Sequence, residues 1–259
     1  MPTLYHMPIA ICAQKVRVCL AEKGVVWDGQ DVTEKLRSPD YLKLNPAGYV
    51  PTLVHEGEVV TESRVISEYI DETFGGPSLQ SSDAYGRSVM RRWTKQINET
   101  FHPFIFILSF IGLFRERILQ LPEEAQRKSM PLDPLKAGRM ANMLKDGWNS
   151  PYLVMALRRF EKLACDMEAA LDTSTWLAGD DYSLADADYT PYLQRMEDLG
   201  LEWLWESRPA LNDWYDRVRS RPSFAAVVSD WIAPEARQAV AEQSREIGPR
   251  FRQALEATQ

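Results

Sequence analysis

Short apolar runs and helical patterns alternate along the first third of the chain. The runs are bounded by turn residues and suit β-strands, and between them apolar positions recur at helical spacing. The predicted strands cover residues 3–6, 25–27, 52–55 and 59–61, and the predicted helices cover 12–23, 38–42 and a segment starting at 62. A βαβ order makes the first two strands parallel, while a short hairpin makes the last two antiparallel. This order predicts a small α/β domain.

The strand pattern stops at Gly75-Gly76-Pro77, a composition break that is typical of a linker. Beyond it, helical periodicity predicts helices at 84–114, 151–171, 183–197, 209–220 and 222–231, and in a charged tail from 234. Residues 122–150 are polar and contain three prolines, so we interpret them as a lid-like insertion with short helices. We therefore predict two domains, an α/β domain at 1–78 and an all-helical domain at 84–259.

The composition narrows the class of protein. Apolar residues make up 45% of the chain and charged residues 26%, as expected of a soluble globular protein. No apolar run approaches the ~20 residues of a membrane span and no signal peptide is evident, so we expect a cytoplasmic protein without a membrane partner. Three cysteines at unrelated spacings argue against a disulfide framework, and three histidines without a cluster argue against a metal site. A net charge of −7 without a basic run argues against a nucleic-acid partner.

The hairpin and the helix after it form a candidate binding site for a small peptide. Pro51 stands at the entrance of a strand, where its missing N–H is tolerated. If the Val50-Pro51 bond is cis, the N–H and C=O of Val50 point outward and can pair with an extended peptide. Glu62 can meet an ammonium group, and the N-terminus of the helix that Glu62-Ser63 begins favours a carboxylate. A structural cis-proline turn beside an ordinary capped helix is the alternative interpretation.

A second signal lies in the helical part. Ser183 is followed three residues later by Asp186, which predicts a capping box at the start of a helix. Such a cap is worth ~1 kcal/mol and suits a helix whose N-terminus is buried. We interpret this pair as structural and do not count it as chemistry.

Taken together, these residues resemble a known family. The motifs are Asn45-Pro46-x-Gly48-x-Val50-Pro51-x-Leu53, then Glu62-Ser63, and then Ser183-Leu184-Ala185-Asp186. Their combination, in this order, resembles the cytosolic glutathione S-transferase superfamily from residue 4 to about residue 231. The resemblance implies a thioredoxin-like N-terminal domain, an all-helical C-terminal domain, and a dimer with active sites in the interdomain cleft. Val60-Thr61-Glu62-Ser63, Arg92-Trp93-Thr94-Lys95 and the insertion at 122–150 look most like bacterial glutathione-dependent enzymes that cleave β-aryl ethers.

The resemblance also implies a set of residues that bind glutathione as the co-substrate. Val50, flanked by Tyr49 and Pro51, would pair its backbone with the cysteinyl part of glutathione. Glu62 and Ser63 would hold the γ-glutamyl head, Ser63 through its hydroxyl and N–H. Arg37 lies where relatives keep a basic residue for the glycine carboxylate, and a solvated surface charge is the alternative for this arginine.

Activation of the glutathione thiol is expected near the start of the first helix, because the family places its activating residue there. Many relatives have serine at the place of Ala10, so activation by a hydroxyl is in doubt here. Cys12, with the adjacent Ala13, is the remaining catalytic candidate, and a helix N-terminus favours its thiolate. Three interpretations stay open: Cys12 lies beside the glutathione sulfur, Cys12 is itself a nucleophile that forms mixed disulfides, or Cys12 is a small apolar residue and backbone N–H groups activate glutathione.

The pocket for the second substrate is expected on the other side of the cleft. Met7, Pro8, Ile9 and Ala10 would line its floor, and Ile97, Phe101 and His102 would come from the helix at 88–108. The alternative for the aromatic stripe on that helix is core or dimer contact, and the alternative for His102 is a packed residue rather than a proton donor. An apolar, aromatic-lined cleft fits a small aromatic electrophile.

Three functions therefore compete. The first is a glutathione transferase that attacks an electrophilic, aromatic substrate, with β-aryl ether cleavage as its most specific form. The second is a Cys12-dependent glutathionyl reductase or lyase. The third is a non-catalytic glutathione-binding protein, which the missing serine at Ala10 favours. We expect a homodimer in each case.

Overall fold

The first part of the chain folds as a four-stranded sheet with helices on both faces. A computed structural model describes residues 1–131, 133–229, 231 and 234–258. The strands are β1 (Thr3–His6), β2 (Asp28–Asp31), β3 (Thr52–His55) and β4 (Glu58–Thr61). Their order is β2-β1-β3-β4, with β1 parallel to β2 and the other two pairs antiparallel. The predicted pairing of the strands is therefore confirmed.

The strand predicted at 25–27 is wrong, because β2 occupies Asp28–Asp31 instead. The register is set by Asp28, which lies opposite Thr3 and donates its N–H to the carbonyl oxygen of Pro2 at 2.9 Å. β2 is an edge strand and is mostly exposed, so a polar sequence suits it. The apolar side chains of Val25 and Trp27 pack against the core from the preceding loop.

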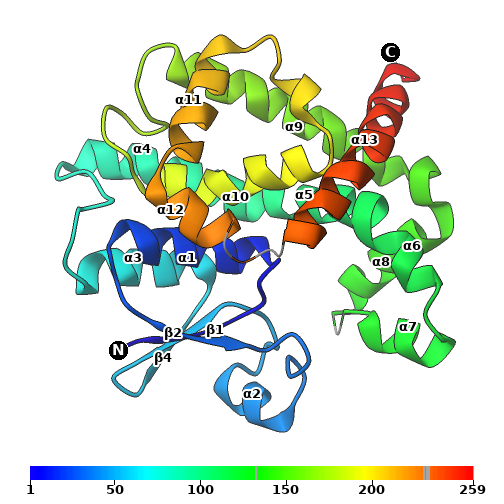
Figure 1. The fold of residues 1–259 in the computed structure, drawn as a ribbon, viewed down its shortest axis with the longest axis horizontal. Coiled ribbons are helices and arrows are strands. Elements are labelled where there is room, and N and C mark those ends of the chain that lie inside the picture. The colour runs from blue at the N-terminus through cyan, green and yellow to red at the C-terminus, as the bar shows by residue number, and fades with distance from the viewer. Residues whose placement is uncertain (132, 230, 232–233, 259) are drawn as a thin grey trace.

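Three helices complete this unit: α1 (Ile11–Glu22), α2 (Pro39–Leu44) and α3 (Ser63–Thr73). Figure 1 shows α1 and α3 between the sheet and the helical part of the protein, and α2 on the opposite side of the sheet. The predicted cap of α2 is present, because the hydroxyl of Ser38 accepts a hydrogen bond from the N–H of Tyr41. The α/β unit with its mixed sheet is the predicted thioredoxin-like domain.

The rest of the described chain is helical, as predicted. The helices are α4 (Ala84–Lys95), α5 (His102–Ser109), α6 (Arg115–Leu119), α7 (Glu123–Ser129), α8 (Pro134–Asp146), α9 (Pro151–Leu171), α10 (Leu184–Asp198), α11 (Pro209–Arg219), α12 (Pro222–Phe224) and α13 (Pro234–Glu256). Short 3₁₀ turns lie at Gly147–Asn149 and Glu202–Leu204, and a π-helical turn lies at Ala225–Ser229. In Figure 1, α7 and α8 lie beside α6, on the side of the helical part that is nearer to the sheet.

One long helical run, Ala84–Leu119, combines α4, α5 and α6 with two π-helical segments, Gln96–Phe101 and Phe110–Phe114. A π-helical turn holds one residue more than an α-helical turn, so it rotates the side chains that follow by about 100° around the axis. This run is long and apolar enough to cross a membrane by length and composition, but half of its most apolar window is buried inside the protein, as in a core helix.

The helical part is joined to the α/β unit through α1 and α10. The predicted capping box is present: the carboxylate of Asp186 accepts the N–H of Ser183, and Asp186 is fully buried. The same carboxylate also accepts the indole N–H of Trp214 at 2.8 Å, so it ties α10 to α11. Across the junction, the guanidinium of Arg221 binds the carboxylate of Glu22 with two hydrogen bonds of 2.7 and 2.6 Å. These contacts fix the cleft in which the predicted site residues lie.

Candidate functional site

The loop before β3 is built to present the backbone of Val50. The Val50-Pro51 bond is cis, as expected, and Val50 makes no hydrogen bond to another described residue through its backbone. Asn45 braces this loop, because its side-chain amide donates to the carbonyl oxygen of Tyr49 and to the hydroxyl of Thr52, both at 2.9 Å. Asn45 holds this loop in place, and the backbone N–H and C=O of Val50 have no partner among the described residues. The extended chain at Val50 is therefore available to pair with a peptide.

Gly48 is required by the geometry of the same loop. Its φ of +65° lies in the left-handed region, and a Cβ there would meet a methyl carbon of Leu42 at 3.3 Å. The glycine therefore lets the chain turn sharply into Val50.

Glu62 and Ser63 stand together at the N-terminus of α3. Glu62 is exposed and has a φ of +68°, a backbone conformation that is costly for a residue with a side chain. Ser63 is the first residue of α3 and is 6% exposed, so its hydroxyl and N–H lie at the helix end where an anion is favoured. A strained acidic residue beside a helix N-terminus matches the predicted holder for an amino-acid head.

Cys12 faces His102 across the cleft. Cys12 is the second residue of α1 and is partly buried, and its Sγ lies 3.8 Å from each ring nitrogen of His102. His102 begins α5, and its Nδ1 lies 2.9 Å from the hydroxyl of Tyr192 on α10. Tyr192 is fully buried, so its hydroxyl fixes the orientation of the imidazole from the protein interior. The arrangement of a thiol, a base and a group that orients the base is the pattern of an activated nucleophile.

The surroundings lower the pKa of the Cys12 thiol to about 7. Burial raises this pKa, but the charge of His102, its hydrogen bond, the charge of Lys15 and a hydrogen bond from Ser63 together outweigh burial. Burial raises the pKa of the Tyr192 phenol well above its usual range, and the negative charge of Cys12 adds to this effect. Tyr192 therefore stays neutral near pH 7 and can donate to or accept from the imidazole.

A buried ion pair lies one helical turn behind Cys12. The ammonium of Lys15 lies 3.6 Å from the carboxylate of Asp188, and both side chains are almost fully buried. Asn98 lies between them: its side-chain oxygen accepts from Lys15, and its Nδ2 donates to Asp188 at 2.9 Å. This network holds the ammonium of Lys15 one helical turn after Cys12, and it joins α1 to α10.

Two buried arginines hold the loop between β1 and α1. Arg17 donates to the carbonyl oxygen of Pro8 at 2.9 Å, and Arg195 donates to that of Ile9 at 3.0 Å. The loop therefore has a fixed path, and Ile9 within it is 49% exposed. Ala10 is the residue that caps α1 and is partly buried.

Ala13 presents no group to the cleft. Its methyl group is fully buried, and its N–H donates to the carbonyl oxygen of Ala10 at 2.9 Å. Cys12 alone of this predicted pair meets the other site residues.

A cavity of about 390 Å³ lies beside this cluster. Its lining comes from the loops around Met7, Arg37 and Tyr49, from the long helical run, and from the stretch that runs from the end of α7 into α8. The lining residues are Met7, Leu36, Arg37, Ala47, Gly48, Tyr49, Phe106, Phe110, Phe114, Ile118, Ser129, Pro131 and Met140. Phe106 is one helical turn beyond His102 on α5, so the lining of the cavity lies within one turn of the Cys12–His102 pair.

The prediction that Ile97 and Phe101 line the substrate pocket is wrong. Ile97 is fully buried and Phe101 is 3% exposed, with its ring packed against Phe160 of α9 at a centroid distance of 5.5 Å. The π-helical turn at Gln96–Phe101 separates this stripe from the residues that follow, and the cavity is lined from the next turns instead.

Arg37 and Tyr49 are both engaged by the segment predicted as a lid. The guanidinium of Arg37 donates to the carbonyl oxygen of Met130 at 2.6 Å. The ammonium of Lys136 lies 4.7 Å from the ring centroid of Tyr49 and donates to its hydroxyl at 3.3 Å. These residues lie at the mouth of the cavity, between the α/β unit and α8.

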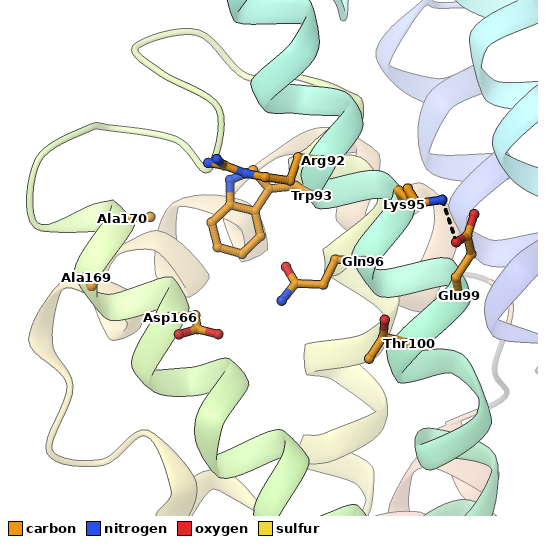
Figure 2. Close-up of a pocket in the computed structure, with 9 residues that line it drawn as sticks. All are labelled: Arg92, Trp93, Lys95, Gln96, Glu99, Thr100, Asp166, Ala169 and Ala170. Atoms are coloured by element: carbon orange, nitrogen blue, oxygen red, sulfur yellow. Dashed lines mark ion pairs between the residues drawn. The ribbon is translucent and has the colours of Figure 1, made fainter.

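A larger cavity of about 600 Å³ lies between α4, the first π-helical turn and α9. Figure 2 shows Trp93, Gln96 and Asp166 around its interior and the Lys95–Glu99 ion pair at its margin. None of the predicted site residues lines it, so its size alone does not make it the functional site. Within the described ranges, no group of three or more His, Cys, Asp or Glu residues could hold a metal ion.

Sequence reasoning missed several residues of this site. Tyr192, Asn98 and Asp188 gave no local signal, because polar residues on a helix are usually solvated. The phenylalanines of the cavity were visible only as part of an apolar helix, and Lys136 only as one charge in a polar insertion.

Comparisons with known proteins identify the family of this site. Residues 4–78 match the family described as "Glutathione S-transferase, N-terminal domain", and residues 150–222 match "Glutathione S-transferase, C-terminal domain". Among curated proteins, the chain is similar to Protein LigF of Sphingobium sp. (strain NBRC 103272 / SYK-6), with 32% identity over 239 residues that cover 85% of this chain and 90% of the relative.

Two further similarities extend over most of the chain. FtsZ-localized protein A of Caulobacter vibrioides (strain NA1000 / CB15N) is 28% identical over 241 residues, which cover 90% of this chain and 95% of the relative. The crystal structure of the beta-etherase LigF from Sphingobium sp. strain SYK-6 superposes with a TM-score of 0.79 at 26% identity, covering 88% of this chain and 99% of that chain.

Proposed function

The chain belongs to the glutathione S-transferase family. From this premise we propose that it joins glutathione, through its thiolate, to a small aromatic electrophile. The observation that carries the proposal is a chain of contacts: Ser63 at the start of α3 binds Cys12, Cys12 contacts His102, and Phe106, one helical turn beyond His102, lines an aromatic cavity. A peptide thiol held at this cradle would meet an apolar substrate held in that cavity.

Each part of glutathione has a candidate partner. The main chain of Val50 would pair with the cysteinyl residue, and Glu62 would meet the α-ammonium group. The hydroxyl and N–H of Ser63 would bind the α-carboxylate at the N-terminus of α3. Arg37 stays the candidate for the glycine carboxylate, and it would then exchange its bond to Met130 for a bond to the ligand. Tyr49 and Pro51 would shape the walls on either side of Val50.

The reaction proposed is attack by the glutathione thiolate on a carbon that carries an aryloxy group. The C–S bond forms as the C–O bond breaks, and the aryloxide leaves with the electron pair and takes up a proton. His102 lies beside Cys12 and is the candidate donor of that proton. Similarity to LigF and its beta-etherase structure supports this specific form.

The test is turnover by the purified chain with millimolar glutathione. Two electrophiles are used: 1-chloro-2,4-dinitrobenzene, and a β-aryl ether whose leaving group is a fluorescent phenol. We expect a glutathione thioether, identified by mass spectrometry, from the ether. Binding of glutathione without turnover of either compound would support a non-catalytic glutathione-binding protein instead, and absence of binding at millimolar glutathione would defeat both.

A second candidate function is favoured by the contact between Cys12 and His102. A thiol with a pKa of about 7 is partly thiolate at neutral pH, so it can attack the disulfide of a glutathionyl substrate. The substrate thiolate leaves, Cys12 becomes a mixed disulfide with glutathione, and a second glutathione thiolate releases oxidised glutathione and restores Cys12. Replacement of Cys12 by Ser distinguishes the two functions, since it abolishes disulfide reduction and is tolerated by ether cleavage.

We also propose that the protein is a homodimer, as the family resemblance implies. Light scattering coupled to size exclusion measures the mass directly, and a mass near twice 29.7 kDa is the expected result.

A further inference from the structure

The cavity beside Cys12 and His102 combines an aromatic interior with a positive mouth. Four aromatic side chains line it: Tyr49, Phe106, Phe110 and Phe114. The rings of Phe106 and Phe110 are 5.8 Å apart between centroids. A volume of about 390 Å³ between flat rings suits one or two aromatic rings of a ligand.

The charged lining of this cavity is positive. Arg37 is the charged residue among its described lining residues, which include no Asp or Glu. Lys136 stands over the ring of Tyr49, which is itself 47% exposed. Neither cation forms an ion pair with a described acidic residue, and each instead contacts neutral groups, the carbonyl oxygen of Met130 and the hydroxyl of Tyr49.

Neighbouring cations on α7 behave differently. Arg127 pairs with Glu123 at 3.4 Å, and Lys128 pairs with Glu124 at 2.7 Å, as is usual on a solvated helix. Arg37 and Lys136 have no carboxylate partner among the described residues, on a protein whose net charge is −7. Their positive charge is available to a ligand.

We infer that the aromatic electrophile carries an anionic substituent, a carboxylate or a phenolate, and that Lys136 is the specificity-determining residue that binds it. This inference rests on the proposed function, because it names the substrate class of the same site. Lys136 is the residue to test, since Arg37 is also the candidate for the glycine carboxylate of glutathione. With an anion bound, the ammonium would exchange its weak contact with Tyr49 for a charge-assisted hydrogen bond.

A matched pair of probes isolates the charge. In both 4-fluoro-3-nitrobenzoate and 4-fluoro-3-nitrobenzamide, glutathione thiolate attacks the ring carbon that bears fluorine, and fluoride leaves with the electron pair. The two probes are similar in shape and differ in charge. We expect kcat/KM of the wild-type protein to be about tenfold higher for the benzoate, after correction for the uncatalysed rates, because a hydrogen bond to a charged group adds about this factor.

Three variants separate the role of Lys136 from general effects. Lys136→Met should lower kcat/KM about tenfold for the benzoate and leave the benzamide within about twofold. Lys136→Arg should restore the preference because it keeps the charge. Lys145→Met removes another exposed lysine of the same helix, one that makes no hydrogen bond or cation–π contact with Tyr49, and it should change neither value.

Equilibrium binding keeps the inference testable if neither probe is turned over. Titration calorimetry with 3-nitrobenzoate and 3-nitrobenzamide compares the same charge difference without chemistry. Tighter binding of the benzoate that disappears in Lys136→Met supports the inference, even where failed turnover has defeated the proposed transfer reaction. Equal binding of the two ligands, or a preference that survives Lys136→Met, overturns it.

Discussion

The Sγ of Cys12 lies 3.8 Å from both ring nitrogens of His102, although 90 residues separate them in the sequence. The contact joins the N-terminus of α1 to the start of α5, so it spans the two parts of the fold. It also gives the thiol its chemistry, because the charge and hydrogen bonding of His102 are the largest effects that lower its pKa. Reactivity of Cys12 therefore depends on the helical part of the protein being docked.

Replacing His102 by Asn should raise the pKa of Cys12 by about one unit or more. Asparagine keeps a polar partner for Tyr192 but cannot carry a positive charge. A wild-type thiol with a pKa of about 7 is mostly thiolate at pH 8, whereas a thiol with a higher pKa is mostly protonated there. The rate of alkylation by iodoacetamide, measured against pH, should have its midpoint near 7 in the wild type and at least one unit higher in the variant.

The alkylation experiment needs a background in which Cys12 is the reacting thiol. Cys19 is fully buried and Cys165 is exposed, so Cys165→Ser removes the competing site. His55→Gln serves as the control, because His55 binds Tyr69 at 2.9 Å and has no contact with Cys12. An unshifted midpoint in His102→Asn would show that the imidazole does not activate the thiol.

Replacing Ser63 by Ala should weaken glutathione binding about tenfold or more. The expected loss is a hydrogen bond to a carboxylate, worth about 1.5–3 kcal/mol. Ser67 offers a matched control on the same helix, since it is also buried and its hydroxyl has no hydrogen-bond partner among the described residues. Titration calorimetry with glutathione measures both variants. Equal losses in Ser63→Ala and Ser67→Ala would mean that the hydroxyl of Ser63 does not touch the ligand.

Replacing Asp186 by Ala should lower the free energy of unfolding by about 3–5 kcal/mol. The carboxylate accepts hydrogen bonds from the N–H of Leu177 and the indole of Trp214, besides those from Ser183, and each donor would be left buried without a partner. Asp133→Ala is the comparison, since Asp133 caps α8 near the surface and should cost about 1 kcal/mol. Thermal unfolding with both variants measures the difference, and similar losses would place Asp186 among ordinary caps.

The cis bond before Pro51 and the helix that starts at Ser63 could be predicted from the sequence because they are local. They follow from proline, turn and helix-end chemistry, and the roles of Val50, Glu62 and Ser63 in glutathione binding stay a prediction. The capping box at Ser183 could be predicted for the same reason. The edge strand β2 could not, because its polar residues become a strand only through pairing with β1.

The substrate side of the cleft depends on contacts that no local pattern records. The π-helical turn before His102 changes the direction of the side chains, so a projection at 3.6 residues per turn places Ile97 and Phe101 toward the pocket, whereas Ile97 is buried and Phe101 packs on α9. His102 was identified, but its partners Cys12 and Tyr192 are 90 residues away in either direction. Such pairings are set by how the helices pack, and a single sequence does not show which distant residues come into contact.

The buried cation of Lys15 contributes both to folding stability and to the reactivity of Cys12, and replacing Lys15 by Met tests both effects. The buried carboxylate of Asp188 would lose the cation 3.6 Å away, and an uncompensated buried charge costs about 3–5 kcal/mol. The double variant Lys15→Met/Asp188→Asn should recover much of that loss, because asparagine is neutral and can still bind Asn98. Lys15 also helps to lower the pKa of Cys12, so the alkylation midpoint should rise in both variants even where stability returns. Thermal unfolding and alkylation of the same samples separate the two effects. A midpoint in Lys15→Met that equalled the wild-type value would show that the charge of Lys15 does not lower the pKa of Cys12.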